Sequence, residues 1–276
     1  MAVQMSALIW SVLPELRIHP VDKWIRAYVG DAVVVSSRRA RLVWEPRRVV
    51  PSYAVPTADV DGEFRAYTGG SGTEHAVRMG DTGPPVLDPR TAFTVHSCPG
   101  SSLTLSTRHG DLPGAAFAPD DPDLADYVVL DWDAFSQWYE EDEPVMGHPH
   151  DPFDRIDCLP SSRRVVVSAH GTVLAQTQRA ILLFETPLPV RYYIPREDVR
   201  MELLTRTEQQ TVCAYKGVAS YWSAQVGDQV VPDVAWSYER PLHDAMPVSG
   251  NIAFLTERLD LEVDGVQLDR PVTPWS

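Results

Sequence analysis

Short stretches in which apolar and polar residues alternate recur along the chain, separated by residues typical of tight turns. Residues 24–35 read WIRAYVGDAVVV with Gly30 and Asp31 at the centre, and an apolar run at 41–44 ends at Glu45. Alternation with a period of two is typical of strands with one buried face, and a central Gly-Asp pair is typical of a tight hairpin turn. The pattern predicts an antiparallel hairpin followed by a third strand.

The same order of elements returns about 140 residues later. Residues 164–175 read RVVVSAHGTVLA, and an apolar run at 181–184 again ends at a glutamate. The matched positions are Gly30 with Gly171, Arg39 with Arg179, Glu45 with Glu185, Tyr53 with Tyr192, Pro56 with Pro195, Asp59 with Asp198 and Val60 with Val199. Chance similarity between two strand-rich segments is the alternative, but it explains matched valines better than matched glycines, prolines and charges. We therefore expect two related β units in tandem.

The repeat and the composition define the expected domains. We place a first, diverged β domain at residues 1–143, a proline-rich linker at 144–160 and a second β domain at 161–276. A chain of 276 residues with 44% apolar residues can form two small cores. Short strands and 24 prolines favour a mainly β fold, in which each domain is a small antiparallel β-barrel or a folded sheet with a few short helices.

The halves diverge after the matched hairpins. Residues 61–91 are rich in glycine and proline and predict a long, mobile loop, which the second domain could use as a lid. The glycine run at 69–72 lacks the Gly-Lys-Ser/Thr of a phosphate-binding loop. Phe135 and Trp138 share one face at helical spacing, so residues 133–143 are the clearest predicted helix.

Charge and cysteine content limit the classes of partner and compartment. Acidic residues outnumber basic ones by 38 to 24, a formal charge of −14, which disfavours nucleic acids and anionic membrane surfaces. No apolar run approaches the roughly 20 residues of a membrane-spanning helix, and residues 1–13 lack the basic start of a signal peptide. Cys98, Cys158 and Cys213 are widely separated, which fits a reducing compartment. We expect a soluble, cytoplasmic protein.

Residues 211–222, TVCAYKGVASYW, hold the densest group of reactive side chains. A thiol (Cys213), a phenol (Tyr215) and an amine (Lys216) fall within four positions, and a glycine follows. Partial burial would lower the pKa of Lys216, and a neutral amine can act as a base or form a Schiff base. The alternative is a surface lysine whose stem lies over Tyr221.

The polar neighbours of Lys216 have structural as well as chemical interpretations. Cys213 could be a nucleophile only as a thiolate, and a turn at Ala214 would be needed to bring the lysine near it; a plain buried cysteine is favoured. Arg179 and Glu185 recur in both halves, which favours a structural ion pair between them. Glu185 could also serve as the acid or base partner of Lys216.

Aromatic side chains are candidate pocket walls. Tyr192 and Tyr193 must face opposite sides of a strand, so one can line a pocket while the other packs. Trp236 and Tyr238 face the same side, and they either floor a pocket for a flat ligand or belong to the core. Trp222 is a further candidate wall residue.

The sequence predicts no metal and no cofactor. His148 and His150 have no further ligands nearby at helical or hairpin spacing, so a proline-locked connector explains them better than a metal site. Asp131 and Asp133 have the spacing of metal-binding carboxylates, which nucleotide transfer would need, but a helix cap explains them better.

Several motifs together carry a family resemblance that covers most of the chain. They are Arg179, Glu185, Tyr193-Ile194-Pro195, Asp198-Val199, Thr211, Cys213, Tyr215-Lys216-Gly217, Tyr221-Trp222, Ala235-Trp236-Ser237-Tyr238 and Pro241, with His148-Pro149, Asp151-Pro152, Arg155 and Asp157 in the linker. On these residues the chain resembles the family catalogued as domain of unknown function 427, in its actinobacterial tandem form. The first half is similar only at Arg39, Glu45, Pro56 and Asp59, and it lacks the lysine motif. The resemblance implies a compact, mostly β domain and a nucleotidyltransferase-like label without a settled activity.

Two functions from different classes fit these residues. The first is a small-molecule enzyme with its site in the second domain, and the alternative is a non-catalytic module that binds a small ligand or a partner. The expected catalytic residues are Lys216, Glu185, Tyr193 and Cys213, and the expected ligand contacts are Arg179, Tyr215, Tyr221, Trp222, Trp236 and Tyr238. A purely structural tandem is a third possibility, and the oligomeric state stays open.

Overall fold

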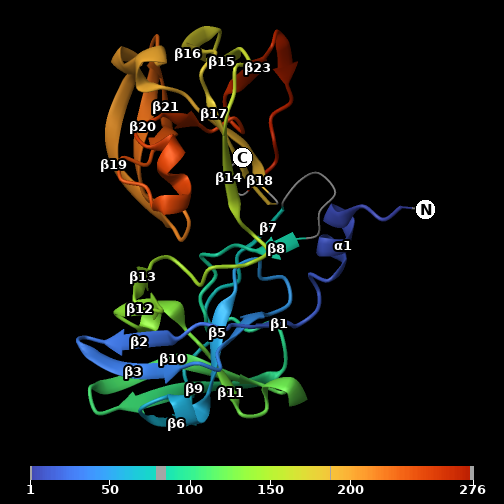
Figure 1. The fold of residues 1–276 in the computed structure, drawn as a ribbon, viewed down its shortest axis with the longest axis vertical. Coiled ribbons are helices and arrows are strands. Elements are labelled where there is room, and N and C mark those ends of the chain that lie inside the picture. The colour runs from blue at the N-terminus through green and yellow to red at the C-terminus, as the bar shows by residue number, and fades with distance from the viewer. Residues whose placement is uncertain (1, 79–84, 187, 274–276) are drawn as a thin grey trace. The chain divides into compact units, whose positions relative to one another are not determined.

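The computed structural model describes residues 2–78, 85–186 and 188–273, and it divides into two compact units, Met1–Asp151 and Pro152–Ser276 (Figure 1). Both units consist mainly of antiparallel strands, which confirms the predicted mainly β fold. The helical elements are α1 (Met5–Ser11) and short 3₁₀ helices at Thr57–Asp59, Pro122–Leu124, Trp132–Ala134, Arg196–Asp198, Met201–Leu203 and His243–Val248. None of the helices in these described ranges has the length and apolarity needed to cross a membrane.

The first unit contains a seven-stranded sheet and a four-stranded sheet. Its strands are β1 (Arg17–Pro20), β2 (Ile25–Val29), β3 (Ala32–Ser37), β4 (Arg41–Trp44), β5 (Ser52–Pro56), β6 (Glu63–Ala66), β7 (Ala76–Arg78), β8 (Pro85–Leu87), β9 (Gly100–Thr107), β10 (Gly110–Pro119), β11 (Tyr127–Leu130), β12 (Gln137–Glu140) and β13 (Glu143–Val145). The larger sheet has the order β1-β4-β5-β11-β10-β9-β6, and the smaller has the order β13-β12-β2-β3. β7 and β8 pair separately.

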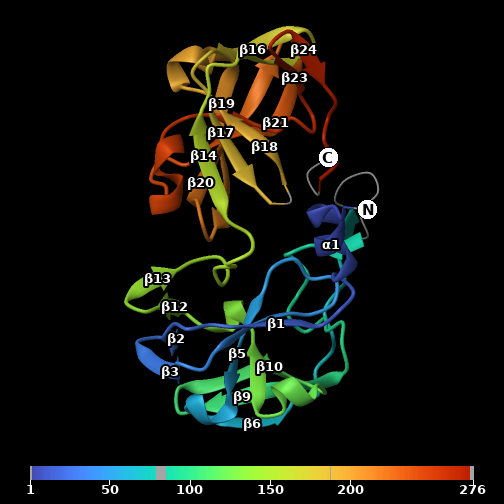
Figure 2. The same ribbon diagram turned by 45° about the vertical axis from the view of Figure 1, so that its right-hand side comes forward.

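The second unit contains three sheets. Its strands are β14 (Ile156–Pro160), β15 (Val165–Ala169), β16 (Thr172–Thr177), β17 (Ile181–Glu185), β18 (Leu188–Tyr193), β19 (Leu204–Cys213), β20 (Gly217–Val226), β21 (Gln229–Ser237), β22 (Ala253–Phe254), β23 (Asp260–Val263) and β24 (Val266–Leu268). The sheet orders are β14-β17-β18, β16-β15-β23-β24 and β19-β20-β21-β22. In Figure 2 the three strands of the first sheet lie side by side. None of the sheets formed by the described residues closes into a barrel, so the predicted barrel is wrong, and each unit instead combines several open sheets.

The two units repeat the same strand pairings. The order β1-β4-β5 of the first unit corresponds to β14-β17-β18 of the second. The hairpins β2–β3 and β15–β16 are each irregular at the same place, between Ala27 and Tyr28 in one and between Val167 and Ser168 in the other. The matched sequence positions therefore lie on matched strands.

A set of polar contacts fixes the first hairpin to the segment after β5. Asp59 accepts hydrogen bonds from the Ser37 hydroxyl at 2.7 Å and from the Arg39 guanidinium at 2.6 Å. The Ser37 hydroxyl in turn accepts from the backbone N–H of Arg39 at 3.1 Å. Because the pKa of Asp59 is lowered by its arginine and serine partners, against the effect of burial, the carboxylate stays charged near neutral pH.

The second unit contains the same contacts around Asp198. Its carboxylate accepts from the Thr177 hydroxyl at 2.6 Å and from the Arg179 guanidinium at 2.9 Å. The sequence predicted that Arg179 would pair with Glu185, and that pairing is wrong: the arginine binds Asp198, in the 3₁₀ helix that follows β18. The structural role expected for Arg179 is thus fulfilled with a different partner, which leaves Glu185 for another contact.

The turn glycines Gly30 and Gly171 offer a paired test of the repeat. Their φ angles are +60° and +77°, a region that costs an L-residue about 1 kcal/mol, and no atom lies within 4 Å of an added Cβ at either position. We expect Gly30→Ala and Gly171→Ala to lower the free energy of unfolding by similar amounts, about 1 kcal/mol each, in urea titrations. Gly70→Ala, equally uncrowded but without a positive φ, is the matched control and should be neutral or slightly stabilising. A large cost in one unit only would contradict the equivalence.

The segment predicted as a helix, residues 133–143, folds differently. It forms a 3₁₀ turn and then the hairpin β12–β13. Trp138 pairs with Ala27 of β2 and is 2% exposed. The spacing of Phe135 and Trp138 was compatible with a helix, but pairing with β2 determines the conformation, as tertiary context does for short apolar patterns.

Three other segments can be compared with their predictions. The carboxylate of Asp131 accepts from the Asp133 N–H at 3.2 Å, as expected for a cap. Residues 61–91, predicted to be a loop, contain β6, β7 and β8, and positions 79–84 lie outside the described residues. Residues 144–160, predicted to be a linker, contribute to β13 in the first unit and form β14 in the second.

Candidate functional site

The turn between β19 and β20 brings Lys216 to Glu185. Cys213 pairs with Gly217 across this turn, and Gly217 adopts a φ of +92°, which favours glycine. Glu185 is the last residue of β17, and its Oε2 accepts a hydrogen bond from Lys216 Nζ at 2.5 Å. Their side chains are 9% and 11% exposed. The reactive stretch and the repeated glutamate therefore meet in one nearly buried ion pair.

The charge state of Lys216 differs from the predicted one. Burial alone would lower the pKa of Lys216, but the carboxylate of Glu185, with contributions from Cys213 and Tyr193, outweighs this effect and raises the pKa above its usual value. The expectation of a lowered pKa is wrong, because it considered burial without an opposing charge at hydrogen-bond distance. The amine is an ammonium at neutral pH.

Aromatic residues of the second unit form an apolar cluster beside this pair. Tyr193, Trp236, Tyr238 and partly buried Tyr221 belong to it. Tyr193 is 1% exposed, and its hydroxyl accepts from Trp236 Nε1 at 3.1 Å. Burial raises the pKa values of Tyr193 and Tyr238, although the charge of Lys216 opposes this at Tyr193. Both phenols therefore keep their protons and can only donate or accept hydrogen bonds.

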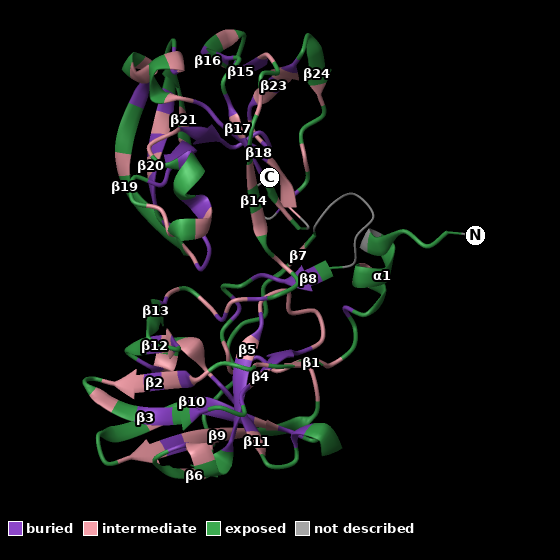
Figure 3. Cartoon of the chain, in the orientation of Figure 1, coloured by how far each residue is buried: buried purple, intermediate pink, exposed green. Residues whose placement is uncertain are grey.

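Three predicted site residues lie elsewhere. Trp222 belongs to the larger apolar cluster, and Arg196 and Arg206 each place a guanidinium 5.6 Å from its ring centre. Arg179 is 60% exposed and pairs with Asp198. Tyr215 is buried in the turn, with the Arg155 guanidinium 5.3 Å from its ring centre. Figure 3 shows the contrast along the hairpin: β20 is largely buried and β19 largely exposed.

Two cysteines, Cys213 and Cys158, lie near enough to Lys216 to interact with its charge. Residues 214–216 form the turn that was needed to bring Cys213 near Lys216, and Cys213 is partly buried. Sequence reasoning missed Cys158 on β14, because that strand was assigned to the linker. Its thiol lies 3.8 Å from the carbonyl oxygen of Asp244, and burial raises its pKa, with the charge of Lys216 acting in the opposite direction. The raised pKa keeps the Cys158 thiol protonated beside the ammonium.

No metal centre accompanies this pair in the part of the chain that the structure describes, where no three His, Cys, Asp or Glu residues are grouped to hold an ion. The polar groups that the structure places here are one ammonium, one carboxylate, two phenols and an indole N–H. Such a set can bind an oxygen anion, hold a proton or move one.

The match to a known protein family falls within the second unit. Residues 157–265 match a family described as Domain of unknown function (DUF427). This range contains Lys216, Glu185, Tyr193 and Trp236, together with all strands from β15 to β23. No curated protein matches the chain.

Proposed function

We propose that the second unit is a small-molecule enzyme whose site is centred on the ion pair between Lys216 and Glu185. The supporting observation is that both charges are about nine-tenths buried. A buried ion pair usually adds little stability compared with apolar residues of the same volume, so its presence points to a role other than stability. Titratable groups with shifted pKa values in such surroundings are concentrated at functional sites.

The geometry favours acid–base chemistry with a charged lysine. Glu185 is the group that accepts a proton, and the Lys216 ammonium stabilises negative charge as it develops on an oxygen atom of the substrate. Tyr193, whose phenol keeps its proton, is the nearby hydrogen-bond donor. A carbonyl compound that loses a proton from the adjacent carbon is the substrate class that uses all three groups. The Schiff-base route is disfavoured, because the raised pKa leaves little neutral amine.

We further infer that the first unit is a diverged copy of the second. The matched strand orders and the matched contacts of Asp59 and Asp198 support this inference. We also place the protein in the cytoplasm, and the three free cysteines support a reducing compartment.

The alternative is a module that binds a small ligand without chemistry. The raised pKa of Lys216 favours it, because a fixed ammonium–carboxylate pair can hold a polar ligand without exchanging protons. The two candidates differ in one observable property: only the enzyme converts a bound compound into another.

A metabolite mixture incubated with the full chain, followed by mass spectrometry, tests the proposal. We expect the native protein to consume at least one carbonyl compound, and Glu185→Gln to slow this by about 100-fold or more, as for the loss of a general base. Lys216→Arg, which keeps the charge, should retain part of the activity.

Glu140→Gln is the matched control for general instability. Glu140 belongs to the first unit and is likewise a buried carboxylate, paired with Lys23 and His150. Its loss should leave product formation per folded molecule unchanged. Retention of a compound by the native protein without any product would reject the enzyme and support the binding module.

A further inference from the structure

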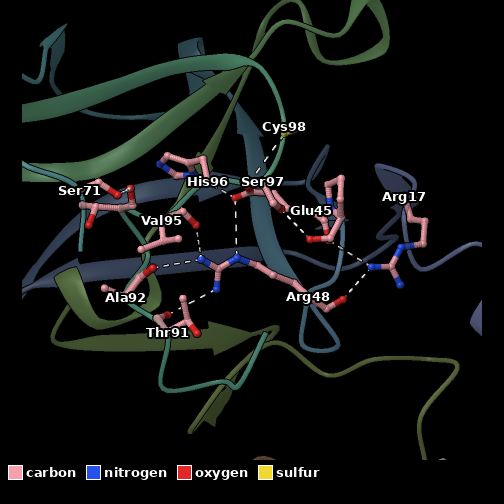
Figure 4. Close-up of polar contacts among 12 residues, drawn as sticks. Arg17, Glu45, Arg48, Ser71, Thr91, Ala92, Val95, His96, Ser97 and Cys98 are labelled. Carbon is pink, nitrogen blue, oxygen red and sulfur yellow. Dashed lines mark hydrogen bonds and ion pairs between the residues drawn. The ribbon is translucent and has the colours of Figure 1, made fainter. Parts of the chain in front are cut away.

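Glu45 occupies in the first unit the place that Glu185 occupies in the second. It follows directly after β4, as Glu185 ends β17, and the two glutamates are matched in the sequence repeat. Its side chain is 4% exposed. Oε2 accepts from the backbone N–H of Ser97 at 2.7 Å, and Oε1 lies 3.0 Å from Nδ1 of His96 (Figure 4). The first unit therefore keeps the buried carboxylate and pairs it with an imidazole instead of an amine.

Two aromatic residues, Phe117 and Phe93, pack against the His96 ring. It stacks on Phe117 with ring centres 3.6 Å apart and an angle of 8°, and Phe93 contacts it edge-on at 5.2 Å. The histidine side chain is 9% exposed. A ring held by a carboxylate and two aromatic residues has a defined orientation, which is the arrangement of a positioned general base.

The second ring nitrogen of His96 is left without a partner. Nε2 is buried and makes no hydrogen bond to any residue within 2–78, 85–186 or 188–273. Because the Glu45 carboxylate can only accept, Nδ1 carries a hydrogen, and in the neutral imidazole Nε2 then presents a lone pair. A buried polar atom of this kind costs free energy unless a ligand satisfies it.

The surrounding charges select the kind of ligand. Arg48 lies 4.0 Å from Glu45 Oε1, but its guanidinium also donates to the carbonyl oxygens of Ala92 at 3.0 Å and Val95 at 2.6 Å (Figure 4). The Asp131 carboxyl group interacts electrostatically with Arg48 and His96, and burial raises the pKa of Asp131 to about 6. Because a lone pair on Nε2 can only accept a hydrogen bond, and the Glu45 and Asp131 carboxyl groups lie near the histidine, the site favours a ligand that brings a hydrogen-bond donor over an anionic one.

The neighbouring thiol does not act as a nucleophile. Burial, followed by the charges of Glu45 and nearby aspartates, raises the pKa of Cys98 to about 12. Its Sγ lies 3.9 Å from Glu45 Oε2 as a protonated thiol. The chemistry of the group therefore resides in the imidazole.

We propose that the first unit contains a second small-molecule site, in which His96 Nε2, backed by Glu45, accepts a hydrogen bond from the hydroxyl or ammonium group of an uncharged or cationic ligand. This site goes beyond the function proposed for the second unit and does not depend on it. Since Nε2 is buried, the segment that carries His96 has to shift to admit a ligand, and the contacts of Arg48 with the carbonyl oxygens of Ala92 and Val95 are the ones that such a shift breaks.

Nuclear magnetic resonance of the full chain labelled with ¹⁵N-histidine tests this site. Ethanolamine and ethylene glycol are the probes, and propionate is the anionic comparison. We expect the His96 spectrum to show hydrogen on Nδ1, and the Nε2 signal to shift saturably with ethanolamine, with glycol or with both, at millimolar concentrations, but not with propionate. Glu45→Gln should weaken the binding about tenfold or more, because a charged acceptor supports the ring.

Controls separate this result from unfolding and from the second unit. His96→Gln removes the His96 signal and so assigns it. His109→Gln, in the exposed turn before β10, should remove only the His109 signal and leave the response of His96 to the probes unchanged. Lys216→Arg should leave the His96 shifts intact, whatever becomes of the activity of the second unit. Hydrogen on Nε2 in the native protein, no shift with either donor probe, or an equal shift with propionate would each overturn the proposal.

Discussion

Replacing Lys216 with methionine should destabilise the protein by about 3 kcal/mol, because it leaves the Glu185 carboxylate buried and unpaired. The two side chains are 9% and 11% exposed and meet at 2.5 Å, so solvent can compensate little. Removing both charges together, as Lys216→Met with Glu185→Leu, should recover most of the loss, since apolar residues of similar volume can replace a buried pair. Chemical denaturation followed by circular dichroism measures all three free energies of unfolding.

The exposed pair of Arg200 and Glu202 is the matched control for this cycle. Its side chains are 50% and 65% exposed, and Arg200→Gln should cost less than about 1 kcal/mol. If Lys216→Met also cost less than this, the ammonium would have to be hydrated in solution, and the proposed site would lose its basis. If the double variant were as unstable as the single one, the pair would stabilise by packing and not by charge compensation.

The parts of the fold that sequence could predict are those set by local residue patterns. Alternating residues around Gly30 and Gly171 predicted two hairpins, and both are present because their turns need a positive φ and their strands bury one face. The matched arginines and aspartates predicted the repeat before their contacts were known. Long-range pairing was not readable in this way: Trp138 joins a sheet through β2, more than 100 residues earlier, and no local pattern encodes that partner.

The site shows the same division. The stretch around Lys216 identified the correct turn, and the repeat identified Glu185 as important, but neither revealed that the two residues touch. The direction of the Lys216 pKa shift depends on that contact, so it could not be derived from burial alone. His96 carries no sequence signal that marks it as a candidate base. Its value as a candidate base appears when Glu45, Phe93 and Phe117 are placed around it.

Acidification from about pH 5 to pH 2 should remove about 3 kcal/mol of stability through Glu140. Burial alone would raise the pKa of this carboxyl, but hydrogen bonds from His150, Lys23 and Tyr53 outweigh it and lower the pKa from 4.5 to about 2. The bond from His150 Nδ1 spans 3.0 Å. Because the folded pKa lies below the unfolded one, the stabilisation is complete above about pH 5 and disappears as the pH falls through the folded value.

Glu140→Gln isolates this contribution. At pH 7 we expect the variant to lose about 3 kcal/mol, since an amide cannot accept the same charged hydrogen bonds. Below pH 5 its stability should fall less steeply than that of the native protein, and the two curves should approach each other near pH 2. Glu143→Gln, exposed in the same hairpin, is the matched control and should follow the native curve throughout. Parallel acid limbs for the native protein and Glu140→Gln would show that other carboxylates determine acid unfolding, and that the contacts of Glu140 with His150, Lys23 and Tyr53 do not hold its pKa low in solution.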